Sequence, residues 1–108
     1  MRRRTILVVN DELGVRESWA QIFSEEGFRV VRASDALEAS KYLAIYRPTA
    51  AICKARLPGS GRVWVAEMAR SKRRRTAFVL VNGESDTELL TTVRRAIGWH
   101  SQLAQAAH

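Results

Sequence analysis

Residues 49–59 read Thr49-Ala50-Ala51-Ile52-Cys53-Lys54-Ala55-Arg56-Leu57-Pro58-Gly59, an apolar run followed by a charged residue and a turn. The run from Thr49 to Cys53 has the length and the continuous apolar character of a strand that is buried on both faces of a parallel sheet. Lys54 follows this run directly, and Pro58-Gly59 is typical of a tight turn. The stretch predicts an α/β fold in which Lys54 lies at the carboxyl edge of the sheet, where such folds bind ligands.

Short apolar runs alternate with segments of helical periodicity along the rest of the chain. Strands are predicted at residues 5–9, 29–33, 49–53 and 77–81. The helices are predicted from apolar stripes, which comprise Val15, Trp19, Ile22 and Phe23; Ala36, Ala39, Leu43 and Tyr46; Trp64, Val65 and Met68; and Leu89, Leu90, Val93 and Ile97. Ser34 is the expected N-cap of the second helix. This alternation is typical of a three-layer α/β fold with a parallel sheet.

Local motifs in this chain have the order and spacing of one known family. They are Ile6 to Glu12, Gly14-Val15-Arg16-Glu17, Glu25-Glu26-Gly27-Phe28, and Leu57-Pro58-Gly59 with Gly61. Through these motifs, residues 4–97 resemble the receiver domain of bacterial two-component response regulators. The resemblance implies a flavodoxin-like fold with a parallel sheet in the order 2-1-3-4, followed by a fifth strand and a fifth helix.

Residues 98–108 do not match that fifth strand. They contain no β-branched residue, and their Ala, Gln and Leu side chains favour helix. We therefore expect the fourth helix to continue or restart here, and residues 1–108 to form a single receiver-like domain that is incomplete at its C-terminus. Strand four would be an exposed edge, and the sheet face that a fifth helix covers would be bare.

These two surfaces predict a homodimer or a larger assembly. The contact would involve strand four, helix four and the tail, with Trp99 as an anchor. The alternative is a degenerate fifth strand within a monomer.

The resemblance also implies where the family's phosphorylation site falls. The acidic pair that binds Mg²⁺ corresponds to Asn10 and Asp11, and the phosphate-accepting aspartate corresponds to Lys54. The hydroxyl residue after strand four corresponds to Asn82, and Arg56 corresponds to the residue whose backbone carbonyl binds the metal. The family's lysine after strand five has no clear counterpart. The chain thus resembles a degenerate pseudo-receiver that lacks the phosphoacceptor.

The charges at these positions argue against metal binding and catalysis. Mg²⁺ requires hard oxygen ligands, which are usually carboxylates and waters. Because an amide replaces one carboxylate and an ammonium replaces another, we expect no metal, no cofactor and no phosphoryl transfer. His100 and His108 lie in a polar tail without a Ser-His-Asp arrangement, so no enzyme activity is predicted.

Three roles are open to Lys54. In the first, it forms a structural ion pair with Asp11 or Glu12 and replaces a cation that the family site otherwise holds. In the second, it points to solvent at a site that has drifted. In the third, it is a nucleophile with a lowered pKa.

Basic residues outnumber acidic ones by 18 to 11, which gives a net charge of +7 and a pI of about 10.7. Since segments that enter parallel strands lie at one edge of a sheet, we expect a basic pole made chiefly of Arg2, Arg3, Arg4, Arg73, Arg74 and Arg75. Such a pole either binds phosphates of a polyanion or is a solvated surface. No helix-turn-helix pattern is present, so sequence-specific DNA recognition is not expected.

The single cysteine, Cys53, leaves no disulfide framework and suits a reducing cytoplasm. No apolar stretch is long enough to span a bilayer, and no signal peptide is recognisable. We therefore predict a cytoplasmic, phosphorylation-independent signalling module that binds a protein partner. The alternative is a polyanion-binding or nucleic-acid-binding protein on an inherited receiver fold, and binding assays at low and high salt separate the two.

Overall fold

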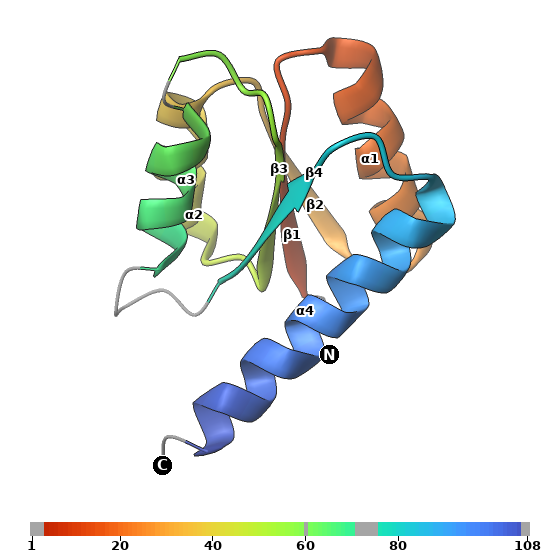
Figure 1. Cartoon of the computed structure of the whole chain (residues 1–108), viewed down its shortest axis with the longest axis vertical. Coiled ribbons are helices and arrows are strands. Elements are labelled where there is room, and N and C mark those ends of the chain that lie inside the picture. Colours follow the sequence, from red (N-terminus) through yellow and green to blue (C-terminus); the bar gives the residue numbers. More distant parts are fainter. Residues whose placement is uncertain (1–3, 60, 71–75, 107–108) are drawn as a thin grey trace.

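The computed structural model describes residues 4–59, 61–70 and 76–106, along which strands and helices alternate (Figure 1). The elements are β1 (Thr5–Val9), α1 (Leu13–Glu25), β2 (Arg29–Ala33), α2 (Ala36–Tyr46), β3 (Ala50–Lys54), α3 (Gly61–Arg70), β4 (Ala77–Val81) and α4 (Asp86–Ala106). The predicted bounds of β1, β2 and β4 are confirmed. β3 begins and ends one residue later than predicted, so Lys54 is the last residue of the strand.

The four strands form one parallel sheet in the order β2-β1-β3-β4, as predicted for a flavodoxin-like fold. Val9 of β1 is in register with Ala33 of β2 on one side and with Cys53 of β3 on the other. β1 and β3 are apolar at nearly every position and are buried on both faces, as central parallel strands require. This register places Lys54 beside the segment that follows β1.

Two helices cover each face of the sheet, which gives the three layers that the sequence predicted (Figure 1). α2 and α3 cover one face, where Leu43 and Val65 belong to one buried cluster with Leu7. α1 and α4 cover the other face, where Phe23 and Val93 belong to one buried cluster with residues of β1, β3 and β4. None of the helices in the described ranges is long and apolar enough to cross a membrane.

α4 continues as a helix through the part of the tail that is described, and the described residues contain no fifth strand. The prediction made from the composition of the tail is therefore confirmed. The prediction of a bare sheet face was wrong, because α4 lies beside α1 and packs Leu89, Val93 and Ile97 into the core. An ion pair of 2.6 Å between Arg94 Nη2 and Glu26 Oε2 joins α4 to the C-cap residue of α1.

Several local predictions need correction. Asp35, and not Ser34, is the N-cap of α2, because its carboxylate accepts a hydrogen bond from the amide of Glu38 at 2.8 Å. Val15 and Tyr46, which belong to predicted buried stripes, keep 38% and 37% of their surface exposed. Val15 is the third residue of α1 and Tyr46 is the last residue of α2, so both lie at an end of their helix.

The structure does not describe three large side chains that the sequence predicted to be buried or at an interface. They are Trp64, Met68 and Trp99.

Candidate functional site

The carboxyl ends of β1, β3 and β4 surround a shallow pocket of about 160 Å³. Asn10, Glu12, Lys54, Arg56 and Asn82 are among the residues that line it. These strand ends meet because the strands are parallel neighbours in the sheet, as the sequence analysis expected. The pocket therefore brings together Asn10, Lys54 and Asn82, which the sequence predicted to lie at one edge of the sheet.

Lys54 is the centre of this site. It is the last residue of β3, and its Nζ donates hydrogen bonds to Asp11 Oδ1 at 3.0 Å and to Glu12 Oε1 at 2.8 Å. The side chain of Lys54 is 25% exposed, and those of Asp11 and Glu12 are 35% and 58% exposed. The ammonium thus lies between two carboxylates in a partly shielded ion pair at the surface.

The ion pair changes the pKa values of two of its members. The hydrogen bonds to Glu12 and then to Asp11 raise the pKa of Lys54 above its ordinary value of 10.5. The hydrogen bond from Lys54 lowers the pKa of Asp11 below its ordinary value of 3.8. Both groups are therefore charged at neutral pH. A lysine that acts as a nucleophile needs a lowered pKa, so this geometry argues against that role for Lys54.

Asn10 organises the turn that carries the two carboxylates. It is buried, and its side-chain Oδ1 accepts a hydrogen bond from the amide of Glu12 at 2.9 Å. Its backbone carbonyl accepts a hydrogen bond from Arg16 Nη1 at 3.0 Å, and its amide donates to the carbonyl of Ala33 at 3.1 Å. Asn10 therefore has a structural role, since it holds Glu12 in a position that reaches Lys54.

The donor atoms at the site do not fit Mg²⁺. Among the described residues, no group of three or more His, Cys, Asp or Glu side chains is placed to hold a metal ion. Asn10 contributes an amide instead of a carboxylate, and the Asp11 carboxylate is bound to an ammonium. Mg²⁺ needs near-octahedral oxygen ligands with negative charge, which this arrangement does not supply.

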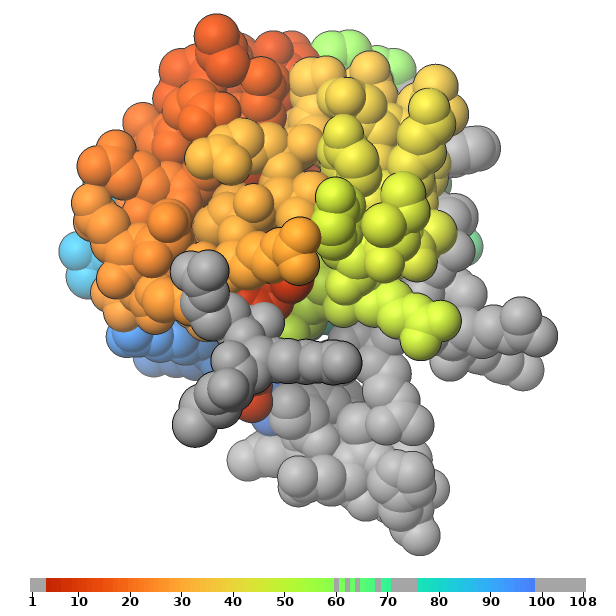
Figure 2. All heavy atoms as spheres, turned by 180° about the vertical axis from the view of Figure 1, so that it is seen from behind, coloured from red at the N-terminus to blue at the C-terminus, as the bar shows by residue number. Residues whose placement is uncertain are grey.

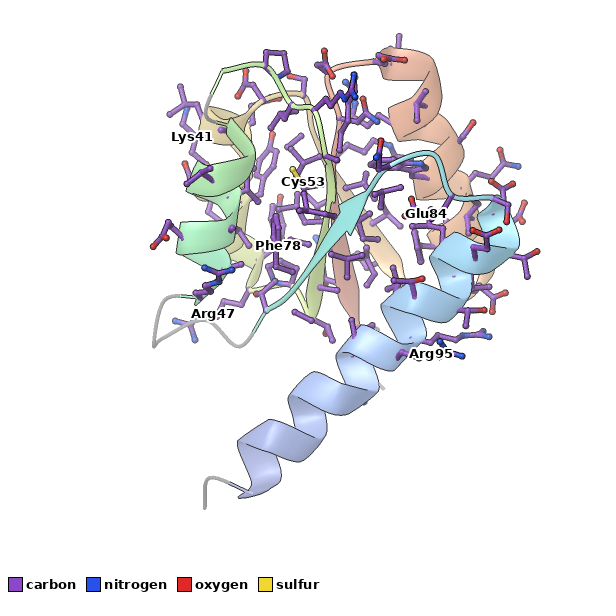
Figure 3. The ribbon with its side chains drawn as sticks, viewed as in Figure 1. Lys41, Arg47, Cys53, Phe78, Glu84 and Arg95 are labelled. Carbon is purple, nitrogen blue, oxygen red and sulfur yellow. The ribbon has the colours of Figure 1, made fainter. Side chains whose placement is uncertain are left out.

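The hydrogen bonds of two residues at the site were not predicted from the sequence. Arg16 lies one turn into α1 and binds the carbonyl of Asn10. Glu84 lies in the loop after β4, and its Oε2 accepts a hydrogen bond of 2.6 Å from the amide of Asn82 (Figure 3). The Asn82-Gly83 pair in the sequence indicated a turn at this point. Gly83 has the positive φ, 82°, that glycine allows in such a turn.

The basic pole lies mainly outside the described residues. Of its six arginines, only Arg4 is described, and it is exposed. Arg2, Arg3, Arg73, Arg74 and Arg75 are not described, so the gathering of these charges remains a prediction from the sequence.

The ion pair predicts a salt-dependent loss of stability in the Lys54→Ala variant. We expect its Tm to fall by a few degrees at low salt and by less at high salt, because exposed ion pairs are screened by ions. Thermal unfolding at low and high salt measures this, and Lys41→Ala, a change at an exposed residue of α2, is the control. Equal Tm values for the native protein and Lys54→Ala at every salt concentration would show that the ion pair does not stabilise the fold.

The pKa shifts set the pH range of this effect. The lowered pKa of Asp11 means that its contribution to stability is present above about pH 3.8 and is lost as pH falls through the folded-state pKa. The raised pKa of Lys54 means that its contribution is present below about pH 10.5 and is lost as pH rises through the folded-state pKa. The difference between the native protein and Lys54→Ala should therefore be constant around neutral pH and disappear in strong acid.

Comparison with known proteins gives matches in structure alone. No protein-family model matches the sequence, and no curated protein matches it. The signal receiver domain of an HD domain-containing protein from Pseudomonas fluorescens Pf-5 is 22% identical, with a TM-score of 0.82 over 97% of this chain and 94% of that one.

Two further solved structures agree with this match. The signal receiver domain of a putative Luxo repressor protein from Vibrio parahaemolyticus is 13% identical, with a TM-score of 0.80 over 99% of both chains. The signal receiver domain of the putative response regulator NarL from Mycobacterium tuberculosis is 20% identical, with a TM-score of 0.77 over 91% of this chain and 98% of that one. The chain therefore has the fold of signal receiver domains.

Proposed function

We propose that this protein is a phosphorylation-independent signalling module, a pseudo-receiver that binds a protein partner without being switched by phosphate. The observation that carries this proposal is the Lys54 ion pair, with Nζ at 3.0 Å from Asp11 and 2.8 Å from Glu12. An ammonium offers no oxygen to accept a phosphoryl group. It also supplies a permanent positive charge where a receiver would bind Mg²⁺.

The surroundings of Lys54 support the same conclusion. The ion pair joins the ends of β1 and β3, and it lowers the pKa of Asp11 and raises the pKa of Lys54, so both of these groups stay charged at neutral pH. Glu84 accepts a hydrogen bond from the backbone N–H of Asn82, so this N–H is not available to bind an anion. A site of this kind suits a constant binding surface better than a switch.

We further propose that the protein is cytoplasmic, has no enzymatic activity and self-associates. The buried lone cysteine Cys53 is in keeping with a reducing compartment. Self-association is supported by the β4 edge, which has no strand on its far side within the described ranges. We do not extend the proposal to nucleic acid, since the arginines that would carry that function are mostly outside the described residues.

The proposal predicts that the protein does not take up phosphate. After incubation with acetyl phosphate and Mg²⁺, intact mass spectrometry should show no added phosphoryl group, because the ammonium of Lys54 cannot accept one. A receiver domain that is known to be phosphorylated serves as the positive control in the same reaction. A hydroxylamine-labile gain of one phosphoryl group would show that a carboxylate of this chain is an acceptor, and would end the proposal.

A further inference from the structure

The two edges of the sheet differ in their protection against pairing. At the β2 edge, Arg29 and Arg32 are exposed, and β2 lies between α1 and α2 (Figure 2). Arg32 forms a 3.0 Å ion pair with Glu17, and the guanidinium of Arg29 lies 5.1 Å from the ring centre of Tyr46. Charged side chains on an edge strand oppose the approach of a second strand. The β2 edge is therefore protected.

The described residues give the β4 edge no such protection. No charged residue occurs from Thr76 to Asn82. Figure 1 looks towards this edge, where β4 lies between the two helix layers without a helix in front of it. An edge strand of this kind is a template for pairing with another chain.

The hydrogen bonds of β4 show which backbone groups face outwards. The amide of Ala77 donates to the carbonyl of Thr49, and the carbonyl of Val81 accepts from the amide of Ala55, so both residues are directed towards β3. The backbone N–H and C=O groups of successive residues point to opposite edges of a strand. Those of Val79 therefore also point towards β3, whereas those of Phe78 and Leu80 point away from it. The next outward amide, that of Asn82, is already bound by Glu84. The open part of the edge thus comprises Phe78 and Leu80.

The side chains of these two residues form an incompletely covered apolar surface. Ala77, Val79 and Val81 are buried under α4. Phe78 points to the opposite side, towards α2 and α3, and is half-buried there (Figure 3). Leu80 shares that face, because side chains alternate along a strand, and it is 45% exposed. The surface therefore combines open hydrogen-bonding groups with exposed apolar area.

We propose that β4 pairs antiparallel with β4 of a second copy of this chain, about a two-fold axis at Val79. Phe78 of each copy would lie opposite Leu80 of the other, so that the outward amide and carbonyl of each residue bind those of its opposite residue. The pairing covers each exposed Leu80 with a Phe78 from the other copy. The result is one sheet that runs through both copies. This inference rests on the proposed function, since it names the partner that the interaction module binds.

The charges that flank β4 favour a second copy in this orientation. In the sequence, Lys72-Arg73-Arg74-Arg75 come shortly before β4, and Glu84, Asp86 and Glu88 come shortly after it. An antiparallel pair brings the segment before one β4 towards the segment after the other, which matches opposite charges at both ends. A parallel pair would bring like charges together, and that is unfavourable. In an antiparallel pair, the basic sequence before β4 of one copy is thus complementary to the acidic sequence after β4 of the other.

A change at Leu80 tests the proposed edge. Sedimentation or light scattering over a range of micromolar concentrations should show a dimer for the native protein. Leu80→Lys should weaken the dimer at least about tenfold, because it places a charge in the centre of the new sheet. Leu37→Lys is the matched control, since Leu37 is 61% exposed on α2, and it should leave dimerisation unchanged. Circular dichroism verifies that both variants keep the fold.

A mixed cross-linking experiment tests the register. In a Cys53→Ala background, Phe78→Cys and Leu80→Cys are prepared as two separate proteins. Oxidation of the mixture should give a disulfide-linked heterodimer in excess of either homodimer, because residues 78 and 80 face each other across the pair at a distance that a disulfide spans.

The outcomes separate this inference from the proposed function. A monomer at every concentration, a dimer that Leu80→Lys does not weaken, or no preference for the mixed disulfide would overturn the pairing through β4. None of these results concerns phosphate uptake, which the mass measurement reports independently. A dimer of a protein that takes up phosphate would leave the pairing intact and refute the pseudo-receiver.

Discussion

The double variant Lys54→Asp/Asn10→Asp is expected to bind Mg²⁺, whereas the native protein is not. The two changes replace an ammonium and an amide by carboxylates at the ends of β3 and β1, next to the carboxylate of Asp11. The site would then have four carboxylates, at positions 10, 11, 12 and 54, and the negative charge that Mg²⁺ requires. Binding to the folded state alone stabilises it, and a Mg²⁺ concentration ten times Kd adds about 1.4 kcal/mol, or about 6 °C in Tm.

Without metal, the same double variant should be less stable than the native protein. Asn10 is 1% exposed, so Asn10→Asp buries a carboxylate close to Asp11 and Glu12, and Lys54→Asp removes the ammonium that neutralises them. Thermal unfolding with and without Mg²⁺ measures both effects in one experiment. The single variant Asn10→Asp is the control, because Lys54 remains and should still repel the ion. If Mg²⁺ raised the Tm of the native protein as much as that of the double variant, our account of the site would be wrong.

The Leu89→Ala variant is expected to lose about 2–5 kcal/mol of unfolding free energy, as large-to-small changes in a core do. Leu89 is 2% exposed and belongs to the cluster that α1 and α4 form over the sheet. For a domain with a total stability of about 5–15 kcal/mol, this loss is a large fraction of the whole. The result would show that α4 is part of the core, and not a helix that detaches from a bare sheet face.

Urea unfolding followed by circular dichroism measures this change, and Leu37→Ala provides the matched control. Leu37 is also a helical leucine, but it is 61% exposed, so its truncation should change the free energy by no more than about 0.5 kcal/mol. Similar midpoints for the two variants would mean that α4 adds little to the stability of the domain. A smaller m-value for Leu89→Ala would indicate that α4 is already detached in the variant.

The sequence was sufficient to predict the elements and the contact of Lys54 with the acidic residues after β1. Continuous apolar runs identified the strands, because a parallel strand that is covered on both faces has no polar side. The composition of residues 98–108 predicted that helix four continues, since helix propensity is a local property. The contact of Lys54 with Asp11 and Glu12 also follows from local facts, because adjacent parallel strands that end in polar residues bring those residues together at one edge.

The tertiary structure alone decided which face of the sheet α4 covers and how the edges differ. An apolar stripe such as Leu89, Val93 and Ile97 shows that a helix packs, but either face of the sheet could have received it. The sequence also did not determine the hydrogen bond between Glu84 and the amide of Asn82, because this contact depends on the path of the chain after β4. Propensity and periodicity act over a few residues, whereas the choice of layer and the exposure of Leu80 result from contacts between segments far apart in the chain.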